Sequence, residues 1–142
     1  MPTISELRAL EILDSRGRPT LLATCALGSG VVATASVPSG ASTGTAEALE
    51  LRDRDPKRYR GLGCLTAARH VSEDIHRALR GKAFASQAEL DQALIALDGT
   101  PNKSRLGANA IVSVLYSTSH ITPGAAEILI YGTAVRLESG AR

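Results

Sequence analysis

The chain has 142 residues, which is enough for one domain with a buried core but too few for two large ones. Its composition is 44% hydrophobic and 21% charged, and its formal net charge of +2 argues against a dedicated nucleic-acid binder. No apolar run is long enough to cross a bilayer, and the amino terminus has no signal-peptide pattern. We therefore expect a cytosolic (cytoplasmic) protein that binds neither nucleic acid nor membrane.

The first part of the chain predicts three β-strands. Residues 3–13, 20–27 and 31–37 are rich in apolar side chains, and the segments 15–19 and 28–30 between them consist of turn-forming residues. Connections this short favour an antiparallel meander.

The next segment, residues 37–44, reads VPSGASTG and is the most specific stretch of the chain. Its glycines allow backbone angles closed to other residues, and its hydroxyl groups and amides can close over an oxygen-rich ligand. The same composition is also typical of any mobile surface loop. The candidate loop residues are Ser39, Gly40, Ala41, Ser42, Thr43 and Gly44.

Helical periodicity follows the loop. We expect a short helix near residues 45–52, and then a longer one that ends near Gly81. Its apolar stripe, spaced by three or four residues, consists of Leu65, Ala68, Val71, Ile75 and Leu79.

Two more helices are expected in the second half of the chain. Ser86 and Glu89 form a capping box for a helix that ends at Gly99. A further helix should begin near Lys103 or Ser104 and point Leu106, Ala110 and Val114 inward. The fold class is therefore α+β, with a three-stranded antiparallel meander followed by a helical bundle.

Residues 52–60 form the densest charge run, but the signs are mixed and Pro56 interrupts it. We interpret it as a solvated loop, with a phosphate-binding patch as the alternative. Cys25 and Cys64 are interpreted as small apolar core residues, because a cytosolic chain keeps thiols reduced. His70 and His76 are six residues apart on one predicted helix, so they do not share a face and we expect no shared metal.

Several blocks at fixed spacing carry a family resemblance. Besides the loop at 37–44 they are residues 11–20, 47–53, 97–100 and 102–111. In this order they resemble the amino-terminal domain of enolase, the glycolytic phosphopyruvate hydratase, over residues 4 to about 111. In enolases a catalytic barrel of eight strand and helix units follows this domain, and such a barrel needs roughly 200 residues. We therefore expect the barrel, with its lysine base, acid partner and acidic metal ligands, to be absent from this chain.

The resemblance implies a role for Ser42. In enolases the corresponding serine gives hydroxyl and carbonyl oxygens to the second Mg²⁺ when the loop closes as a lid on the substrate, and Gly40 and Ala41 act as hinge and cover. Mg²⁺ favours hard oxygen ligands in octahedral geometry. One serine without the barrel is not expected to hold Mg²⁺ measurably, so no catalytic residue is assigned within this chain.

The sequence departs from the family pattern at three positions before residue 111. Leu10 and Leu22 stand where enolases usually have arginine and glutamate, which tend to form ion pairs across the dimer, and Arg18 replaces the usual asparagine of a turn. The standard dimer is therefore in doubt, and neutral drift is the alternative explanation.

Beyond Ile111 the resemblance fades. We divide the chain into an enolase amino-terminal-like domain, residues 1–116, and a divergent tail, residues 117–142. The tail is either a remnant of the enolase carboxyl terminus or an unrelated sequence.

Three functions remain open at this stage. The first is the amino-terminal domain of an enolase, the enzyme that converts 2-phosphoglycerate to phosphoenolpyruvate. We expect such a domain to be inactive alone, so the chain itself is not assigned as an enzyme at this stage. The second is an interaction module that docks on a separate barrel or on full-length enolase. The third is a small anion-binding domain that uses the loop amides. A domain built to cover a barrel would also expose apolar surface and could self-associate.

Overall fold

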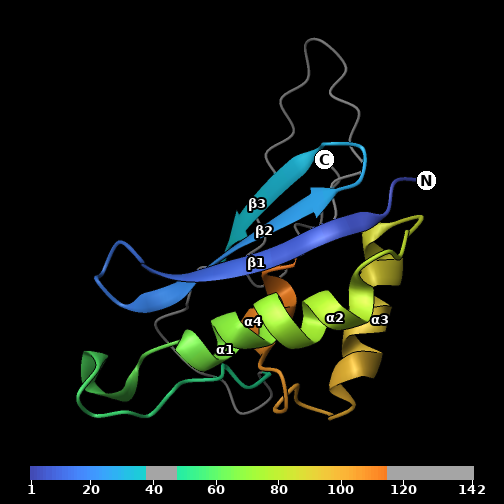
Figure 1. The fold of residues 1–142 in the computed structure, drawn as a ribbon. Helices are drawn as coiled ribbons and strands as arrows, with labels where there is room; N and C mark the ends of the chain where they lie inside the picture. The colour runs from blue at the N-terminus through green and yellow to red at the C-terminus, as the bar shows by residue number, and fades with distance from the viewer. Residues whose placement is uncertain (38–47, 115–142) are drawn as a thin grey trace, which may run out of the picture.

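Three strands form one antiparallel sheet in the computed structural model of the chain, which describes residues 1–37 and 48–114 (Figure 1). β1 (Ile4–Leu13), β2 (Pro19–Leu27) and β3 (Val32–Ser36) lie side by side in chain order. The predicted meander is confirmed, and so is the α+β class, because helices follow the sheet.

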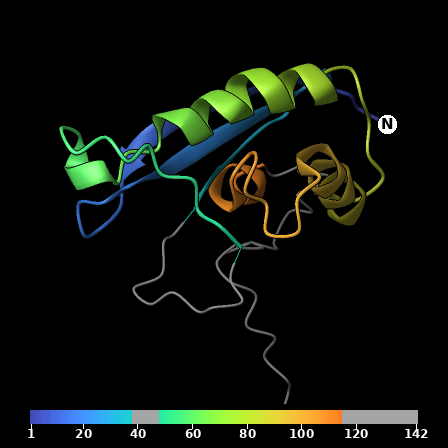
Figure 2. The same cartoon turned by 90° about the horizontal axis from the view of Figure 1, so that it is seen from below.

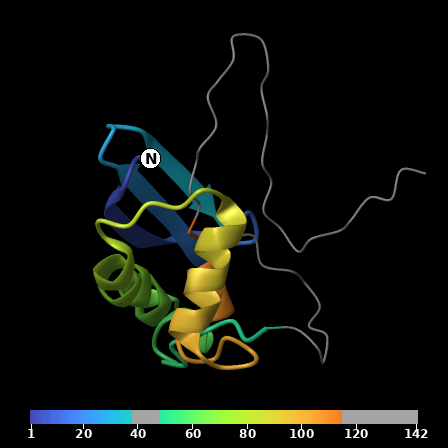
Figure 3. The ribbon, with the colours of Figure 1, turned by 90° about the vertical axis from the view of Figure 1, so that its right-hand side faces the viewer.

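The sheet has one covered face and one open face. In β2 the residues Leu21, Ala23, Cys25 and Leu27 are buried, and the residues between them are only partly covered. Figure 3 shows the helices gathered on one side of the sheet. In β2 every second side chain from Leu21 onward thus lies in the core.

Leu10 and Leu22 lie on the open face, directly opposite each other in the β1–β2 pairing. Leu10 is 65% exposed. This cross-strand apolar pair stands where the family usually has two opposite charges, and its effect on a dimer stays a prediction.

One continuous helical rod crosses the covered face of the sheet (Figure 2). It consists of α1 (Leu65–Arg69), the π-helical turn η2 (His70–Ile75) and α2 (His76–Leu79), and the backbone stays right-handed helical at both junctions. The predicted apolar stripe is buried from Ala68 to Leu79, whereas Leu65 is 50% exposed. Ser72 of the π turn and His76 of α2 both contact the first strand.

The remaining helices are α3 (Gln87–Asp98) and α4 (Ala108–Val112), and a short 3-10 turn, η1 (Tyr59–Gly61), precedes the rod. The predicted capping box of α3 is confirmed. The Ser86 hydroxyl accepts a hydrogen bond from the Glu89 N–H, and the Glu89 carboxylate reaches back to the Ala85 N–H. Gly99 ends this helix with a left-handed backbone, as its position predicts.

The core lies between the sheet and the helices. Its largest fully buried side chains come from β1, β2, the helical rod, α3 and the loop before α4, and they include Ile4, Leu7, Leu21, Val71, Ile75, Leu79, Leu90, Leu94 and Leu106. Cys25 and Cys64 are buried free thiols, as predicted, and burial raises the pKa of both to about 11. Within the described residues there is no helix of the length and apolar character required to cross a membrane.

Two helix predictions need correction. Residues 48–52 are not helical, although residues 45–47 lie outside the described part. The last helix begins at Ala108 and not near Ser104, because side chains of the preceding loop bind the backbone amides of residues 104 and 106. The first difference arises from hydrogen bonds to residues distant in sequence, and the second from side-chain hydrogen bonds that span four and eight residues; helix propensity includes neither.

The outer edge of β1 is covered by the helical rod. The N–H of Leu7 donates to Nδ1 of His76 (3.1 Å), and the N–H of Ala9 donates to the hydroxyl of Ser72 (3.0 Å). An exposed strand edge would offer these amides to another chain. His76 and Ser72 therefore join the helix to the sheet and block edge pairing.

Replacing His76 with alanine should lower the free energy of unfolding by about 1–3 kcal/mol, because the partly buried Leu7 amide loses its acceptor. Hydrogen exchange at Leu7 should accelerate. His76→Gln, whose side-chain oxygen can accept the same bond, should lose less stability. Arg77→Ala, an exposed neighbour on the rod, is the control, and an equal loss in both alanine variants would contradict this assignment.

Candidate functional site

The predicted lid lies outside the described residues. Ser39, Gly40, Ala41, Ser42, Thr43 and Gly44 all belong to the undescribed segment 38–47, so their roles stay predictions. The structure does describe the residues on both sides of this segment. The positions of these two anchors limit where a lid formed by segment 38–47 can lie.

Val37 is the upstream anchor. Its N–H donates to the carbonyl of Leu21 (3.0 Å), and its own carbonyl accepts a hydrogen bond from the hydroxyl of Thr20. Both the Val37 and the Thr20 side chains are buried. The chain therefore leaves the sheet from a position fixed to β2.

The downstream anchor is the extended segment Leu49 to Leu51. The N–H of Leu49 donates to the carbonyl of Asn102 (2.8 Å), and its carbonyl accepts from the N–H of Ala108 (2.8 Å). The carboxamide of Asn109 then accepts from the N–H of Leu51 (3.0 Å) and donates to its carbonyl (3.1 Å). These four bonds fix the segment against the start of α4.

Gly107 makes this approach possible. Its φ is 95°, a region that favours glycine, and a Cβ there would lie 2.5 Å from the Leu51 Cβ and 2.7 Å from the Asn109 side-chain oxygen. No larger residue fits without moving the downstream anchor.

Asp98 organises the loop that binds the downstream anchor. Its carboxylate is 2% exposed and accepts hydrogen bonds from the Leu106 N–H (2.7 Å), the Thr100 N–H (3.0 Å) and the Thr100 hydroxyl. Burial alone would raise the pKa of this carboxyl, but the hydrogen bonds from Thr100 and Leu106 outweigh it and lower the pKa. The carboxylate is thus charged in the folded protein.

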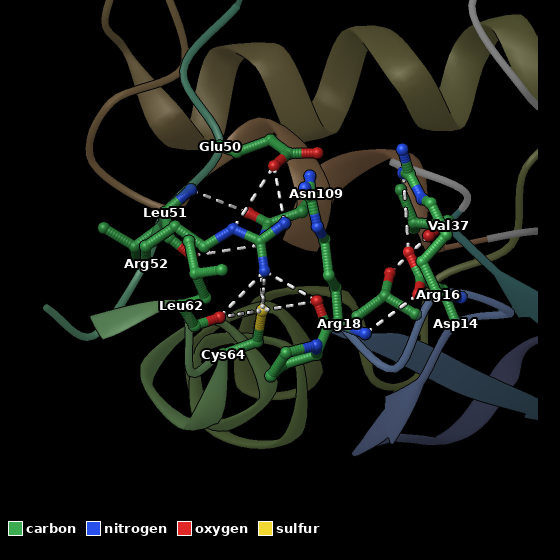
Figure 4. A network of polar contacts seen from close by, with 12 residues as sticks. Asp14, Arg16, Arg18, Val37, Glu50, Leu51, Arg52, Leu62, Cys64 and Asn109 are labelled. Carbon is green, nitrogen blue, oxygen red and sulfur yellow. Dashed lines mark hydrogen bonds and ion pairs between the residues drawn. The ribbon is translucent and has the colours of Figure 1, made fainter. Parts of the chain in front are cut away.

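Arg52 connects the downstream anchor to the sheet and to the residues just before the rod (Figure 4). Its guanidinium donates to the carbonyls of Pro19 (2.6 Å) and Leu62 (2.9 Å) and lies 3.0 Å from the Cys64 sulfur. It also forms an ion pair with Glu50 at 2.7 Å. The interpretation of residues 52–60 as merely solvated is therefore wrong for Arg52, whose side chain is 16% exposed.

The turn between β1 and β2 also lies near this network (Figure 4). The Asp14 carboxylate accepts from the N–H groups of Arg16 (2.8 Å) and Arg18 (2.9 Å). The Arg18 amide is the main cause that lowers the Asp14 pKa. Because Arg18 takes part through its backbone, its replacement of the usual asparagine leaves this turn intact.

The described residues contain no group of three or more histidine, cysteine, aspartate or glutamate side chains that could hold a metal ion. His70 and His76 instead contact backbone groups, the Leu106 carbonyl and the Leu7 amide.

Comparison with known proteins assigns the family. The family model described as the enolase N-terminal domain matches residues 4–133. This chain belongs to the enolase N-terminal domain family. The match includes part of the segment assigned above to a divergent tail.

A relative shows the extent of this similarity. The enolase of Legionella pneumophila (strain Lens) is 56% identical to this chain over 110 residues. The aligned part is 78% of this chain but only 26% of the Legionella enolase. The chain thus spans about a quarter of the length of that relative.

The anchoring roles of Arg52, Asp98 and Asn109 were not predicted. All three lie in the blocks that carry the family resemblance, and the structure shows that these distant blocks meet around the segment that follows residues 38–47. The available signal was an aspartate directly before the glycine that ends one helix and an asparagine two residues after the glycine that precedes the next. Such residues often bind backbone amides.

Replacing Asn109 with alanine should destabilise the domain by about 1–3 kcal/mol, because both polar groups of Leu51 lose their partner. Amide exchange at Leu51 should accelerate more than exchange in β1. The matched control is Asn102→Ala, since Asn102 is exposed and holds Leu49 through its backbone only. Equal exchange at Leu51 in the wild type and the Asn109 variant would contradict the anchor.

Asp98 should also produce a pH dependence of stability. Its folded pKa lies below the usual value of 3.8, so its contribution is fully present above the unfolded pKa and is lost as the pH falls through the folded pKa. Asp98→Asn should lower stability at pH 7 and flatten the acid limb of stability against pH. Urea unfolding from pH 7 to pH 2 tests this, with the exposed Asp55→Asn as control; parallel curves for Asp98→Asn and the wild type would refute it.

Proposed function

We propose that this chain acts as the lid-carrying amino-terminal part of a phosphopyruvate hydratase, which interconverts 2-phosphoglycerate and phosphoenolpyruvate. The observation that carries this proposal is the convergence of the family's sequence blocks on the two anchors of segment 38–47. The similarity to the Legionella enolase supports the same activity for the whole protein to which such a domain belongs.

Both ends of the proposed lid are attached to fixed parts of the domain. The backbone N–H and carbonyl of Val37 and of Leu49 each form a hydrogen bond, so closure of the intervening residues need not deform the domain. A lid that closes over substrate excludes water and completes the site. The rigid frame thus reduces the ordering cost of closure.

Within this proposal Ser42 supplies oxygen ligands to Mg²⁺ when the lid is closed. The other ligands come from the substrate and from carboxylates of a catalytic barrel, because the described residues hold no cluster of metal-ligating side chains. The barrel belongs either to a longer form of the protein or to a separate enolase chain on which this domain docks. We accordingly propose no turnover by these 142 residues alone.

A chimera tests this proposal. Residues 1–114 of this chain would replace the matched amino-terminal part of the Legionella enolase, and dehydration of 2-phosphoglycerate would be followed at saturating Mg²⁺. We expect an active chimera in which Ser42→Ala lowers kcat by roughly tenfold or more, in the range typical of perturbed metal sites.

Ser29→Ala, the same change in the turn between β2 and β3, is the matched control and should leave kcat unchanged. The isolated chain should show no turnover. Turnover by the isolated chain, or full activity of the Ser42→Ala chimera, would overturn the proposal.

A further inference from the structure

Residues 53–63 form a closed surface loop whose ends meet. The N–H of Asp53 donates to the carbonyl of Gly63 (2.8 Å), and the N–H of Arg54 donates to that of Gly61 (2.9 Å). The loop contains η1 and lies beside the start of the helical rod, away from α3 (Figure 1). Compact loops of this type, with ends in contact, frequently carry function.

The acidic groups of the loop are used inside the protein. The Asp53 carboxylate accepts from the N–H groups of Leu65 and Thr66 (both 2.9 Å), and the Asp55 carboxylate accepts from the Lys57 N–H (2.9 Å). One cation of the loop is also engaged, because Arg58 pairs with Glu11 at 2.5 Å. These bonds fix the loop on β1 and on the rod.

Three cations of the loop remain available. Arg54, Lys57 and Arg60 are exposed, and within residues 1–37 and 48–114 none of them forms an ion pair. The loop therefore presents a local positive charge on a protein whose net charge is only +2.

The backbone beneath two of these cations is strained. Arg54 has a φ of 59° and Arg60 a φ of 53°, values that glycine adopts at lower cost. Such strain persists only where the surrounding structure fixes it, and it concentrates at binding sites. Arginine at both positions therefore points to a use for the side chain that outweighs its backbone cost.

Apolar surface adjoins the cations. Tyr59 is 46% exposed and Leu62 40% exposed, and the Arg58 guanidinium stands 5.5 Å from the centre of the Tyr59 ring. Arginine and tyrosine dominate the residues that contribute most to protein–protein binding. A partner for this surface needs both acidic and apolar groups.

We propose that residues 53–63 are a docking loop for an acidic segment of a partner protein, independently of any enolase activity. Carboxylates of the partner pair with Arg54, Lys57 and Arg60, while an apolar side chain packs on Tyr59 and Leu62. Guanidinium groups bind carboxylates with two parallel hydrogen bonds. A single-stranded nucleic acid fits less well, because Tyr59 is the only aromatic residue of the loop and Arg58 already lies over its ring.

The test is an NMR titration of the full chain with a dodecapeptide of eleven glutamates around one leucine. Amide shifts should concentrate at residues 53–63 and decrease as salt is added. The same peptide with glutamine for glutamate should produce no shifts. Shifts located elsewhere, or shifts produced equally by the glutamine peptide, would overturn the proposal.

Arg54→Gly and Arg60→Gly distinguish binding from folding. Each should keep or raise the urea midpoint, because glycine relieves the left-handed backbone, and each should weaken peptide binding by roughly fivefold or more. Arg80→Ala removes one exposed charge outside the loop and should leave affinity unchanged. Unchanged affinity in both glycine variants would overturn the proposal. So would tighter binding of a dodecathymidylate to the same loop, or concentration-dependent shifts there without peptide.

Discussion

The domain depends on the pairing between the segment Leu49 to Leu51 and the start of α4. Asn109 satisfies both backbone groups of Leu51, and Gly107 allows the two backbones to approach closely. Because this contact joins residues almost sixty positions apart, it holds the second half of the chain against the segment that directly follows residues 38–47. Arg52 extends the same contact to β2 and to the loop that precedes the rod.

The two buried polar side chains beside the downstream anchor both form hydrogen bonds, and these bonds fix the geometry of the site. Asp98 and Asn109 are both almost inaccessible, and each binds backbone groups and not solvent. Groups of this kind are costly when unpaired and so favour a single arrangement. The two segments that flank residues 38–47 are therefore short, but their hydrogen bonds hold one arrangement. A loop that closes over a ligand requires such a frame.

Local patterns in the sequence predicted the meander, the apolar stripe of the rod and the capped α3 helix. These features depend on residues close together in the chain, such as Ser86 and Glu89. The predicted helix over 45–52 was wrong in its described part because Asn102, Ala108 and Asn109 bind the backbone of residues 49–51. The start of α4 was displaced by Asp98 and Thr100 in the same way. Family resemblance predicted a lid at residues 39–44, but only the structure shows which side chains hold the residues that flank segment 38–47.

Hydrogen exchange at the Leu51 amide tests the central claim most directly, since the claim is that a rigid frame holds the lid. If the frame is part of the folded core, Leu51 should exchange only through global unfolding, with the same opening free energy as Val71 in the rod. Exchange at Leu51 several orders of magnitude faster than at Val71 would show that the anchor opens independently and would contradict the account.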